Sequence, residues 1–564
     1  MKATVSRRQL LRYLGMGSAA TVLAACTPTP TPAPTPKPPE PTKAPAGATS
    51  APVATAVPKP TAVPATKQPL TITYWVELNS NVAATLKNLG EVACYKEMEK
   101  ITGVRVEFQH PPAGQAIEQF NLMVASGKYP DIIEYNWLRA PGGPGKYLKG
   151  KVILQLNDLI DKHAPNLKKV LNDRPDWKKA VQTDDGEFYV FPFLRGDARL
   201  LTASGPAIRG NYLDRLNIPL PQTIDDWHAM LVAFKTKDPN GNGKADEIPF
   251  TMNQSGSKYR AISGCHLFIG AWGMTWDWYQ VNGVVKYSLL QPEYKEFLKL
   301  LVGWYKEGLL DPEYITDNAA ALDAKWTDGR LCSGYLWAGS GIGKYMGLMI
   351  PKDPSYRLVG APLPTLKAGE KPMLGQRDQW YPGGFSAAIT TAAKRPAETA
   401  QWLDFGYGPQ GHMLLNHGVE GVSYTLVNGY PKYTDLIMKN PQGLPLAHAM
   451  GQHQRSNHAG PFVQDVRFFE QYLQYPEQLE AIKHWASPTN DRHLPPITAT
   501  QDESKRFATI MNDVGTRALE AFDKIVTGAQ PVDSWDQVVG QLKQMGVEEA
   551  VQLRQAALDR YNKR

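Results

Sequence analysis

Residues 70–135 decide the fold of this chain of 564 residues. Three apolar, β-branched runs follow one another there: Leu70-Thr-Ile-Thr-Tyr-Trp75, Val104-Arg-Val-Glu-Phe108 and Tyr129-Pro-Asp-Ile-Ile-Glu-Tyr135. Each run is typical of a β-strand, and residues 87–102 and 117–126 between them have the periodicity of amphipathic helices. This alternation predicts an α/β fold with a parallel sheet, in which ligands bind at the carboxyl ends of the strands. The residues at or just beyond those ends are Trp75, Glu77, Asn79, Trp137 and Arg139.

The first 25 residues are typical of an export signal. Ser6-Arg7-Arg8-Gln9-Leu10-Leu11 is a twin-arginine box, and a weakly apolar run follows it. Leu23-Ala24-Ala25-Cys26 is similar to the lipobox of bacterial lipoproteins, which predicts a lipid on the thiol of Cys26. A transmembrane anchor is the alternative, but residues 13–25 are too few to span about 30 Å of hydrocarbon as a helix. We therefore expect a lipid anchor on the outer face of the cytoplasmic membrane, at the cell surface or in a periplasm.

Residues 26–68 consist almost wholly of Pro, Thr, Ala, Val and Lys. This composition buries too little apolar surface to offset the entropy of ordering, so we expect a disordered stalk with polyproline character. Residues 1–68 hold eight of the 61 Lys and Arg residues and one of the 54 Asp and Glu residues, which leaves 53 of each sign in the body. The net charge of +7 therefore belongs to the leader and stalk, and it gives no argument for nucleic-acid binding.

The segment Asp238-Pro-Asn-Gly-Asn-Gly-Lys-Ala-Asp-Glu247 has the composition of a calcium loop. The expected oxygen donors are the side chains of Asp238, Asn240, Asn242, Asp246 and Glu247 and the backbone carbonyl of Lys244. Calcium takes roughly six to eight such ligands, and Gly243 permits the sharp turn between them. The opening is that of an EF-hand loop, but the twelfth position, which needs a Glu, falls on Pro249. A polar Asn-Gly turn that binds nothing is the alternative.

Aromatic residues are the most informative signal for a ligand site. The chain holds 14 Trp and 25 Tyr, many in loop-like contexts such as Trp272-Gly-Met-Thr-Trp-Asp-Trp-Tyr279. Aromatic faces stack on flat C–H surfaces, and the hydroxyl groups of a sugar need polar partners. Trp337 is the first candidate, because Gly339 and Gly341 leave its ring room beside a backbone bend. The other candidates are Trp75, Trp137, Trp272, Trp380, Arg195, Glu420 and Tyr424. Core packing is the alternative for any one Trp.

A secreted carbohydrate-active hydrolase or lyase would be aromatic-rich too. It would need paired carboxylates or a set of Tyr, His and Arg, and acidic residues are too plentiful here to decide the matter. Gly384-Phe-Ser386-Ala-Ala lacks the final Gly of a serine-hydrolase elbow. Gly339-Ser-Gly-Ile-Gly-Lys344 lacks the first Gly and the closing Ser or Thr of a phosphate loop. On these residues alone a hydrolase or lyase stays open; a binding protein rather than an enzyme is what the family resemblance described below implies.

The cysteines that follow Cys26 are Cys94, Cys265 and Cys332. An odd number of widely spaced thiols in an exported protein does not make a disulfide scaffold. One bridge among them and buried free thiols are both open.

Several motifs resemble, in the same order, the extracellular solute-binding proteins of ABC transporters, of the carbohydrate-binding family 1 type. They are the strand at 70–75, "YPDII" at 129–133, Leu156-Asn-Asp-Leu-Ile-Asp161, Asp184-Asp-Gly-Glu-Phe-Tyr-Val-Phe-Pro192, Pro221-Gln-Thr-Ile-Asp-Asp-Trp227, the stretch 406–424 and Leu494-Pro-Pro-Ile-Thr498. These motifs spread over nearly all of residues 69–564. The loop at 238–249 is similar to the calcium site of a subgroup that includes alginate-oligosaccharide-binding proteins, which implies a structural Ca²⁺ on the donors named above.

The resemblance implies an α/β fold of the periplasmic-binding-protein type, with two lobes, a hinge and an interlobe cleft that closes on the ligand. Residues 69–195 and 362–440 would form the first lobe. Residues 196–361 and 441–564 would form the second lobe, with the calcium loop and the C-terminal helices. The chain would cross after Phe193, near Ala361-Pro-Leu-Pro-Thr365, and between Tyr424 and Gly460.

The resemblance also implies a function. The protein would be a monomer that captures an oligosaccharide or a related solute and delivers it to the permease subunits of an ABC importer. A lipoprotein that presents its ligand to a membrane sensor is the alternative. Neither the motifs nor the composition identify the solute.

Overall fold

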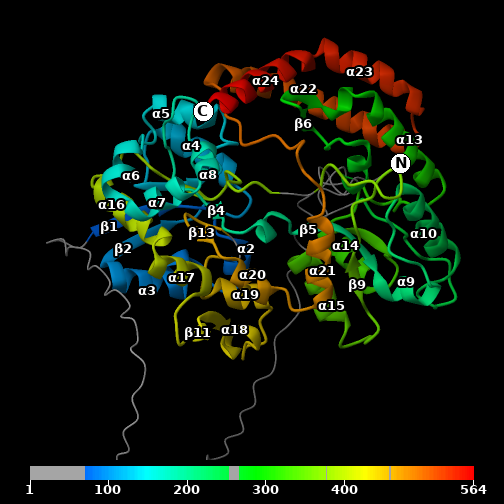
Figure 1. Ribbon diagram of the computed structural model, residues 1–564, viewed down its shortest axis with the longest axis horizontal. Helices are drawn as coiled ribbons and strands as arrows, with labels where there is room; N and C mark the ends of the chain where they lie inside the picture. The colour runs from blue at the N-terminus through cyan, green and yellow to red at the C-terminus, as the bar shows by residue number, and fades with distance from the viewer. Residues whose placement is uncertain (1–69, 253–265, 376–377, 457–458) are drawn as a thin grey trace, which may run out of the picture. The chain divides into compact units, whose positions relative to one another are not determined.

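The computed structural model describes residues 70–252, 266–375, 378–456 and 459–564 (Figure 1). The predicted export signal, the stalk, the lipidation site at Cys26 and the thiol of Cys265 lie outside these residues. In the part of the chain that is described, no helix is both long enough and apolar enough to cross a bilayer. Two large hydrophobic cores divide the described residues into a first lobe and a second lobe.

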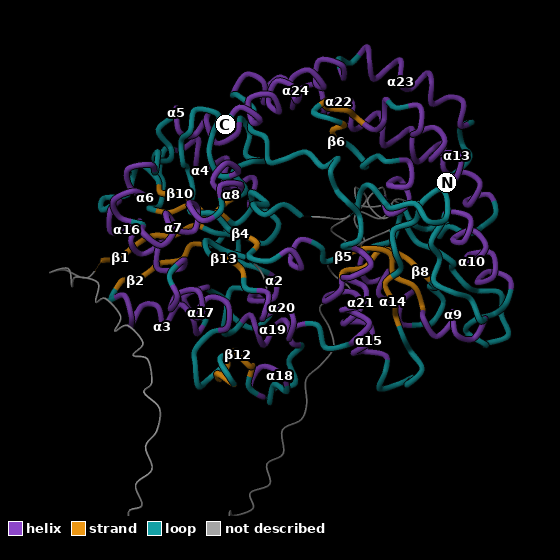
Figure 2. Tube along the Cα trace, viewed as in Figure 1, coloured by secondary structure: helices purple, strands orange, loops and turns teal. Residues whose placement is uncertain are grey.

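The first lobe is built on a four-stranded sheet with the order β10-β3-β1-β2 (Figure 2). As the alternating pattern predicts, β1 (Leu70–Trp75) pairs in parallel with β2 (Val104–Gln109) and β3 (Ile132–Tyr135). From far along the chain, β10 (Ser386–Ile389) pairs antiparallel with β3. The residues just before β10 therefore reach the same edge of the sheet as the residues just after β1 and β3.

The helices of the first lobe end where the sequence predicts. α3 (Ala93–Thr102) and α4 (Ala116–Ser126) are each followed by a glycine in the left-handed conformation that stops a helix. The helix expected over 87–102 begins late, because a 3-10 turn at Leu89–Glu91 precedes α3. The other helices of this lobe are α2 (Ser80–Ala83), α5 (Gly143–Lys149), α6 (Asn157–His163), α7 (Pro165–Asp173), α8 (Pro175–Ala180), α16 (Pro396–Asp404) and α17 (Pro409–His417).

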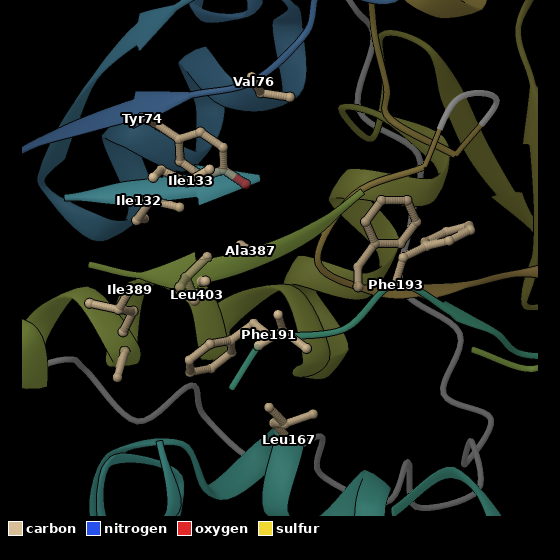
Figure 3. Close-up of a cluster of buried hydrophobic side chains, with 14 of the residues drawn as sticks. Tyr74, Val76, Ile132, Ile133, Leu167, Phe191, Phe193, Ala387, Ile389 and Leu403 are labelled. Atoms are coloured by element: carbon tan, nitrogen blue, oxygen red, sulfur yellow. The ribbon is translucent and has the colours of Figure 1, made fainter. Parts of the chain in front are cut away.

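The first-lobe core joins residues from distant parts of the chain. Side chains of β1, β3 and β10 pack with Phe191, Phe193 and Leu403, as Figure 3 shows. A buried ion pair crosses this core: Arg455 Nη2 donates to Glu134 Oε1 at 2.6 Å, and the hydroxyl of Tyr74 donates to Glu134 Oε2 at 2.6 Å. Breaking such a pair would leave an uncompensated buried charge, so it ties residue 455 firmly to this lobe.

The second lobe contains a three-stranded antiparallel sheet with the order β8-β5-β9. Its strands are β5 (Ser204–Arg209), β8 (Ser333–Trp337) and β9 (Leu358–Gly360). Thr223 and Asp226 form a capping box at the start of α10 (Ile224–Thr236). The other elements are β6 (Trp278–Val281), β7 (Val284–Tyr287), α9 (Gly210–Leu216), α12 (His266–Ile269), α13 (Pro292–Lys306), α14 (Ala319–Thr327), α15 (Lys344–Met349) and α21 (Pro476–Trp485).

Three C-terminal helices pack on the second lobe, and the end of the last one also contacts the first lobe. α22 (Gln501–Val526), α23 (Trp535–Gln544) and α24 (Val547–Lys563) place their apolar faces in the second-lobe core. At the end of the chain, however, Arg560 and Arg564 each bind the carboxylate of Asp184 in the first lobe at 2.6 Å. The C-terminal helices therefore buttress the second lobe, as the sequence predicts, and also bond to the first.

A third, smaller core lies between the segment 424–473 and the second lobe. It brings Tyr424, Phe468 and Phe469 together with Leu336 and Trp485. The elements of this segment are β11 (Tyr424–Val427), β12 (Tyr430–Tyr433), α18 (Asp435–Met438), α19 (Leu446–Gly451) and α20 (Val466–Tyr472).

The chain passes between the two main cores at positions that differ in part from those expected. The first crossing follows Phe193, where β4 (Leu194–Arg195) pairs in parallel with β13 (Val463–Gln464). The crossing expected at 361–365 is wrong: Ala361 and Leu363 belong to the second-lobe core, and the chain reaches the first-lobe core at Tyr381.

The expected third crossing also lies further along the chain. Residues from Tyr424 to Met450 pack in the third core, and Ala459 and Phe462 return to the first-lobe core, so the last crossing follows Phe462 instead of falling between 424 and 460. The physical reason for both corrections is pairing. Thr365 bridges Thr223 within the second lobe, and the buried Arg455 holds the residues around it in the first lobe. Local proline density does not reveal either contact.

The two described cysteines, Cys94 and Cys332, are free and buried. Burial raises the pKa of the Cys94 thiol to about 12 and moves the pKa of Cys332 in the same direction. Both thiols are therefore protonated and unreactive at neutral pH.

Candidate ligand site at the lobe crossings

A cavity of about 200 Å³ lies where the chain passes between the lobes. We call it the crossing pocket. It is lined by Leu201, Asp378, Gln379, Trp380, Asn490, His493 and Pro495. These residues come from the stretch after the first crossing, from the second crossing and from the loop that precedes α22. Three segments more than a hundred residues apart thus build one small site beside the hinge.

Arg195 orders the wall of the crossing pocket. It ends β4, and its backbone N–H donates to the carbonyl of Trp380 at 2.9 Å. Its guanidinium donates to Asp378 Oδ2 from Nε at 3.2 Å and from Nη2 at 2.8 Å, and to Gln464 Oε1 from Nη1 at 2.6 Å. One side chain therefore joins all three crossing segments. Of the residues predicted from the sequence, Arg195 and Trp380 are brought together here.

The remaining polar groups of the pocket are held by the backbone. Gln379 Nε2 donates to the carbonyl of Leu494 at 3.0 Å. Asn490 Nδ2 donates to the carbonyl of Pro488, and its Oδ1 accepts from the N–H of Gly375, both at 3.0 Å. His493 Nε2 lies 3.1 Å from the carbonyl of Gly375. These contacts fix the side chains before any ligand arrives, which lowers the entropic cost of binding.

Trp380 supplies the aromatic wall. It is half-buried, and its ring centroid lies 6.0 Å from that of Trp177. The guanidinium of Arg174 lies over both rings, 4.2 Å from Trp177 and 4.6 Å from Trp380, and it is paired with Asp176 at 2.6 Å. Stacking of this kind holds an indole in place while part of its surface stays open.

The other predicted aromatic residues do not line the crossing pocket. Trp137 is fully buried, and its Nε1 donates to the carbonyl of Ser386 at 3.0 Å. Trp75 packs in the same first-lobe core but also lines a separate cavity of about 560 Å³ together with Gln109 and Tyr129. The partly buried Trp272 packs against Phe297 with ring centroids 5.8 Å apart. For Trp137 the core-packing alternative fits its burial.

Trp337 is 45% exposed at the end of β8, as expected of a binding platform. The glycines that follow it have a different role from the one predicted. A Cβ atom on Gly339 would lie 2.0 Å from the ring of Tyr472, and one on Gly341 would lie 2.9 Å from Leu336. They permit close packing beneath the strand end rather than making room for the indole.

Glu420 and Tyr424 lie apart from the residues that line the crossing pocket. Glu420 is exposed, whereas Tyr424 is buried in the third core with its ring 5.7 Å from that of His417. Burial raises the pKa of the Tyr424 hydroxyl to about 12, and the charge of Glu420 acts in the same direction. The structure gives these two residues packing partners rather than a place in the pocket.

Sequence reasoning missed most of the crossing pocket. Asp378, Gln379, Asn490 and His493 carry no motif, and no local signal brings them together. Phe385 was missed as well: it precedes β10 at the carboxyl edge of the first-lobe sheet, is 44% exposed and has a φ of 55°. Such a conformation is strained for a bulky residue. The pair Gly383-Gly384 before an aromatic residue was the available signal.

Asp277 adds a buried charge to the aromatic cluster at 272–279. Its Oδ1 accepts from the N–H of Trp278 at 2.5 Å. Burial raises the pKa of Asp277 to about 6, and the cations of Arg554 and Arg139 act in the opposite direction. Arg554 stacks over Phe507 at 4.4 Å, and Arg139 belongs to the first lobe. The protonation of Asp277 therefore responds to residues on both sides of the crossings.

The loop 238–247 follows α10 and is folded around its own side chains. Asp238 Oδ1 accepts from the N–H groups of Gly241 and Asn242, and its Oδ2 accepts from that of Gly243, at 2.9–3.1 Å. Asn240 Oδ1 accepts from the N–H of Asn242, and Asn242 Oδ1 accepts from the N–H of Lys244. These turns fold the loop tightly back on its own side chains.

Glu247 lacks the partner that its burial demands. Both of its carboxylate oxygens are buried and without a hydrogen bond. Burial raises the pKa of Glu247, and the nearby charges of Asp238 and Asp246 add to the effect. An orphaned buried carboxylate costs free energy unless a cation satisfies it, so the donor set fits a hard cation such as Ca²⁺.

The carboxylates of this loop are not gathered into a cluster. Among the residues that the structure describes, no group of three or more His, Cys, Asp and Glu side chains is positioned to hold a metal ion. Instead, the amide Nδ2 atoms of Asn240 and Asn242 both donate to Asp246 Oδ1 at 3.1 Å. Metal binding would require these amides to turn their oxygens inward and release Asp246.

Comparison with curated proteins identifies carbohydrate-binding relatives. FusA of Streptococcus pneumoniae serotype 4, a fructooligosaccharide ABC transporter substrate-binding protein, is 27% identical over 503 residues, which cover 84% of this chain and 88% of FusA. YtcQ of Bacillus subtilis, a polygalacturonan/rhamnogalacturonan-binding protein, is 23% identical over 347 residues, which cover 58% of this chain and 63% of YtcQ.

Solved structures show the same architecture. The alginate-binding protein AlgQ2 without calcium ion has a TM-score of 0.70 and 27% identity, and the match covers 88% of this chain and 99% of AlgQ2. FusA in complex with kestose has a TM-score of 0.69 at 24% identity over 87% of this chain and 99% of FusA, which supports the two-lobe fold. A family model, bacterial extracellular solute-binding protein, matches residues 79–413, more than half of the chain. This chain therefore belongs to the bacterial extracellular solute-binding protein family.

Proposed function

We propose that this protein is the substrate-binding component of an ABC importer and that it captures an oligosaccharide between its two lobes. The crossing pocket carries this proposal. It combines one face of Trp380 with the fixed polar groups of Asp378 and Gln379, which is the combination that sugar rings require. The carbohydrate ligands named for FusA and AlgQ2 support it.

Capture follows from the position of the pocket. A ligand that touches Asp378 and Trp380 contacts the crossing segments themselves, so its binding free energy favours the lobe orientation in which those segments close around it. The exposed rings of Trp337 and Phe385 are the proposed platforms for further sugar units. No bond in the sugar is broken in this scheme.

Calcium is part of the proposal, as a structural ion. The side chains of Asp238, Asn240, Asn242, Asp246 and Glu247 and the carbonyl of Lys244 would hold it. When bound, the ion supplies positive charge that satisfies the buried carboxylate of Glu247. The calcium ion named for AlgQ2 and the EF-hand named for FusA support this assignment.

The N-terminal segment completes the proposal. A twin-arginine signal would export the folded chain, a lipid on Cys26 would anchor it outside the cytoplasmic membrane, and the stalk 26–68 would let it reach the permease. Cys26→Ala, expressed in a bacterium that processes lipoproteins, should release the protein from the membrane fraction while its thermal stability stays the same.

One experiment separates capture from catalysis. The protein is incubated with kestose, nystose, maltotriose and cellotriose; binding is followed by calorimetry, and the recovered sugar is analysed by mass spectrometry. We expect saturable binding of at least one sugar, recovered intact, and a loss of that binding in Trp380→Ala. Formation of a shorter sugar would show an enzyme, and absence of binding to any oligosaccharide, neutral or acidic, would refute the proposal.

A further inference from the structure

The crossing pocket offers hydrogen-bond acceptors where a charged sugar would need donors. Asp378 is 39% exposed at its side chain, and a carboxylate has roughly four acceptor positions. Arg195 fills positions on Oδ2, and the N–H of Gln379 donates to Oδ1 at 3.0 Å. Because Gln379 Nε2 is committed to the carbonyl of Leu494, the carbonyl oxygen of its amide is the end left for a ligand.

Of the residues that the structure describes, the two guanidinium groups beside the pocket, those of Arg195 and Arg174, are already paired. Each nitrogen of the Arg195 guanidinium donates to Asp378 or Gln464. The guanidinium over Trp380, that of Arg174, donates to Asp176 from Nε at 2.9 Å and from Nη2 at 2.6 Å. Asn490, a neutral donor that lines the pocket, already uses its Nδ2 to donate to the backbone carbonyl of Pro488. Little is left to neutralise an anion.

Sugar hydroxyls and sugar carboxylates meet this surface very differently. A hydroxyl can donate to Asp378, and hydrogen bonds to a charged acceptor are the strong ones. A uronate carboxylate only accepts, so it would face the like charge of Asp378 with no free guanidinium to compensate. Sequence similarity alone does not decide between a neutral and an acidic sugar, because FusA is named for a neutral oligosaccharide and YtcQ for an acidic one.

We propose that the crossing pocket selects an uncharged sugar ring, with Asp378 as the residue that accepts its hydroxyls and rejects uronates, and with Arg195 as a positioning residue. This inference rests on the proposed function and adds the class of substrate. Arg195 acts through Asp378: it holds the carboxylate in place, and in the same contact its positive charge is balanced by that carboxylate.

The test compares two matched sets of trimers by calorimetry at pH 7 and low salt. Kestose, maltotriose and cellotriose are the neutral probes, and trigalacturonate and trimannuronate are the acidic ones. The wild-type protein should bind at least one neutral trimer and bind both acidic trimers at least 100-fold more weakly. Tighter binding of an acidic trimer would overturn the inference while the proposed function stands. Failure of every trimer would remove both.

Variants of Asp378 probe the mechanism. Asp378→Asn keeps the shape and one acceptor but removes the charge, so affinity for the neutral trimer should fall about 10- to 100-fold. Asp378→Ala frees the guanidinium of Arg195, and affinity for trigalacturonate should rise at least tenfold over wild type. If Asp378→Ala instead lost affinity for neutral and acidic trimers alike, with an unchanged melting temperature, the role assigned to Asp378 would be contradicted.

Two controls complete the design. Asp536→Asn removes an aspartate from a surface pair with Lys295 on the second lobe, and it should change neither affinity. Arg377 precedes Asp378 and lies outside the described residues. Arg377→Ala should leave the preference for neutral trimers unchanged. If the wild-type protein bound an acidic trimer and Arg377→Ala lost that binding, the inference would fail.

Discussion

The loop 238–247 and the crossing pocket each present a carboxylate to a proposed ligand, but they are built in opposite ways. The loop takes all its donors from ten consecutive residues, and its key carboxylate, Glu247, is buried without a partner. The pocket takes its donors from three distant segments, and its key carboxylate, Asp378, is held by Arg195 at 2.8 Å.

This difference teaches what each site can bind. A buried carboxylate without a partner needs a cation and contributes little stability until it has one. A paired, half-open carboxylate costs little when empty and can accept a hydroxyl group from a ligand. The loop is therefore suited to hold the second lobe together, and the pocket is suited to exchange a solute.

Removing calcium should have the largest effect of the changes that test this difference between the loop and the pocket. With calcium at about a thousand times its dissociation constant, the ion stabilises the folded state by about 4 kcal/mol. Excess EGTA should therefore lower the melting temperature by about 4 °C in a calorimetric scan. Affinity for a neutral trimer, measured at low temperature, should stay within twofold.

Glu247→Ala serves as the control for chelation, because it should be less sensitive to EGTA than the wild-type protein. If EGTA weakened sugar binding and left the melting temperature unchanged, the loop would belong to the ligand site and the contrast would collapse.

Asp277 provides an intermediate case, a buried carboxylate whose compensating cations are stacked or distant. Its pKa in the folded protein is about 6, above the ordinary value of 3.8. The unfolded chain therefore loses this proton first, and the contribution of Asp277 to stability is lost as the pH rises from about 4 to about 6. The full shift corresponds to about 3 kcal/mol, and partial exposure to solvent reduces this to about 2 kcal/mol.

Urea unfolding of the wild-type protein and of Asp277→Asn at several pH values measures this effect. The variant should gain stability relative to wild type between pH 4 and pH 6, with a plateau above pH 6.5. Asp536→Asn, an exposed aspartate, should track the wild-type curve. A constant difference between Asp277→Asn and wild type across this range would show that Asp277 is not perturbed.

The contrast also explains what could be predicted from the sequence. The parallel strands β1, β2 and β3 were predictable because their signal is periodicity within short stretches, and the calcium ligands of the loop 238–247 stay a prediction from spacing. Arg195 and Trp380 were named, but only the fold shows that the backbone of one binds the backbone of the other. Asp378 and Gln379 could not have been predicted, because their role comes from contacts with Arg195 and Leu494 far along the chain.

Burial set the other limit. Trp75 and Trp137 follow strand ends, as ligand platforms do, yet they are core residues. A tryptophan after a strand can turn either toward the cleft or back under the sheet, and the pattern of neighbouring residues is the same in both cases. The crossings at 381 and 462 were missed for a related reason, since they depend on which core a segment joins and not on its prolines.

Trp380→Ala tests whether the crossing pocket binds the sugar, in the way that chelation tests whether the loop 238–247 binds calcium. Loss of the indole face should weaken binding of the neutral trimer by about 2 kcal/mol, roughly 30-fold, since stacked aromatic contacts and buried apolar area are both lost. The melting temperature should fall only slightly, because Trp177 and Arg174 still cover one another. Trp380→Phe should recover part of the affinity. A large loss of stability with unchanged affinity would place Trp380 in the core instead.

The smallest expected effect concerns how far the site extends from the pocket. Trp337 is 45% exposed, so Trp337→Ala should leave the free energy of unfolding within about 0.5 kcal/mol of wild type. A platform for a second or third sugar unit contributes about 1 kcal/mol, which is about fivefold in affinity. The comparison of a disaccharide with a trisaccharide of the same sugar isolates this contact by calorimetry. Because the crossing pocket holds one ring, only the longer ligand should lose affinity in Trp337→Ala; an equal loss for both would show that Trp337 touches the first ring, so that the site spans both lobes at once.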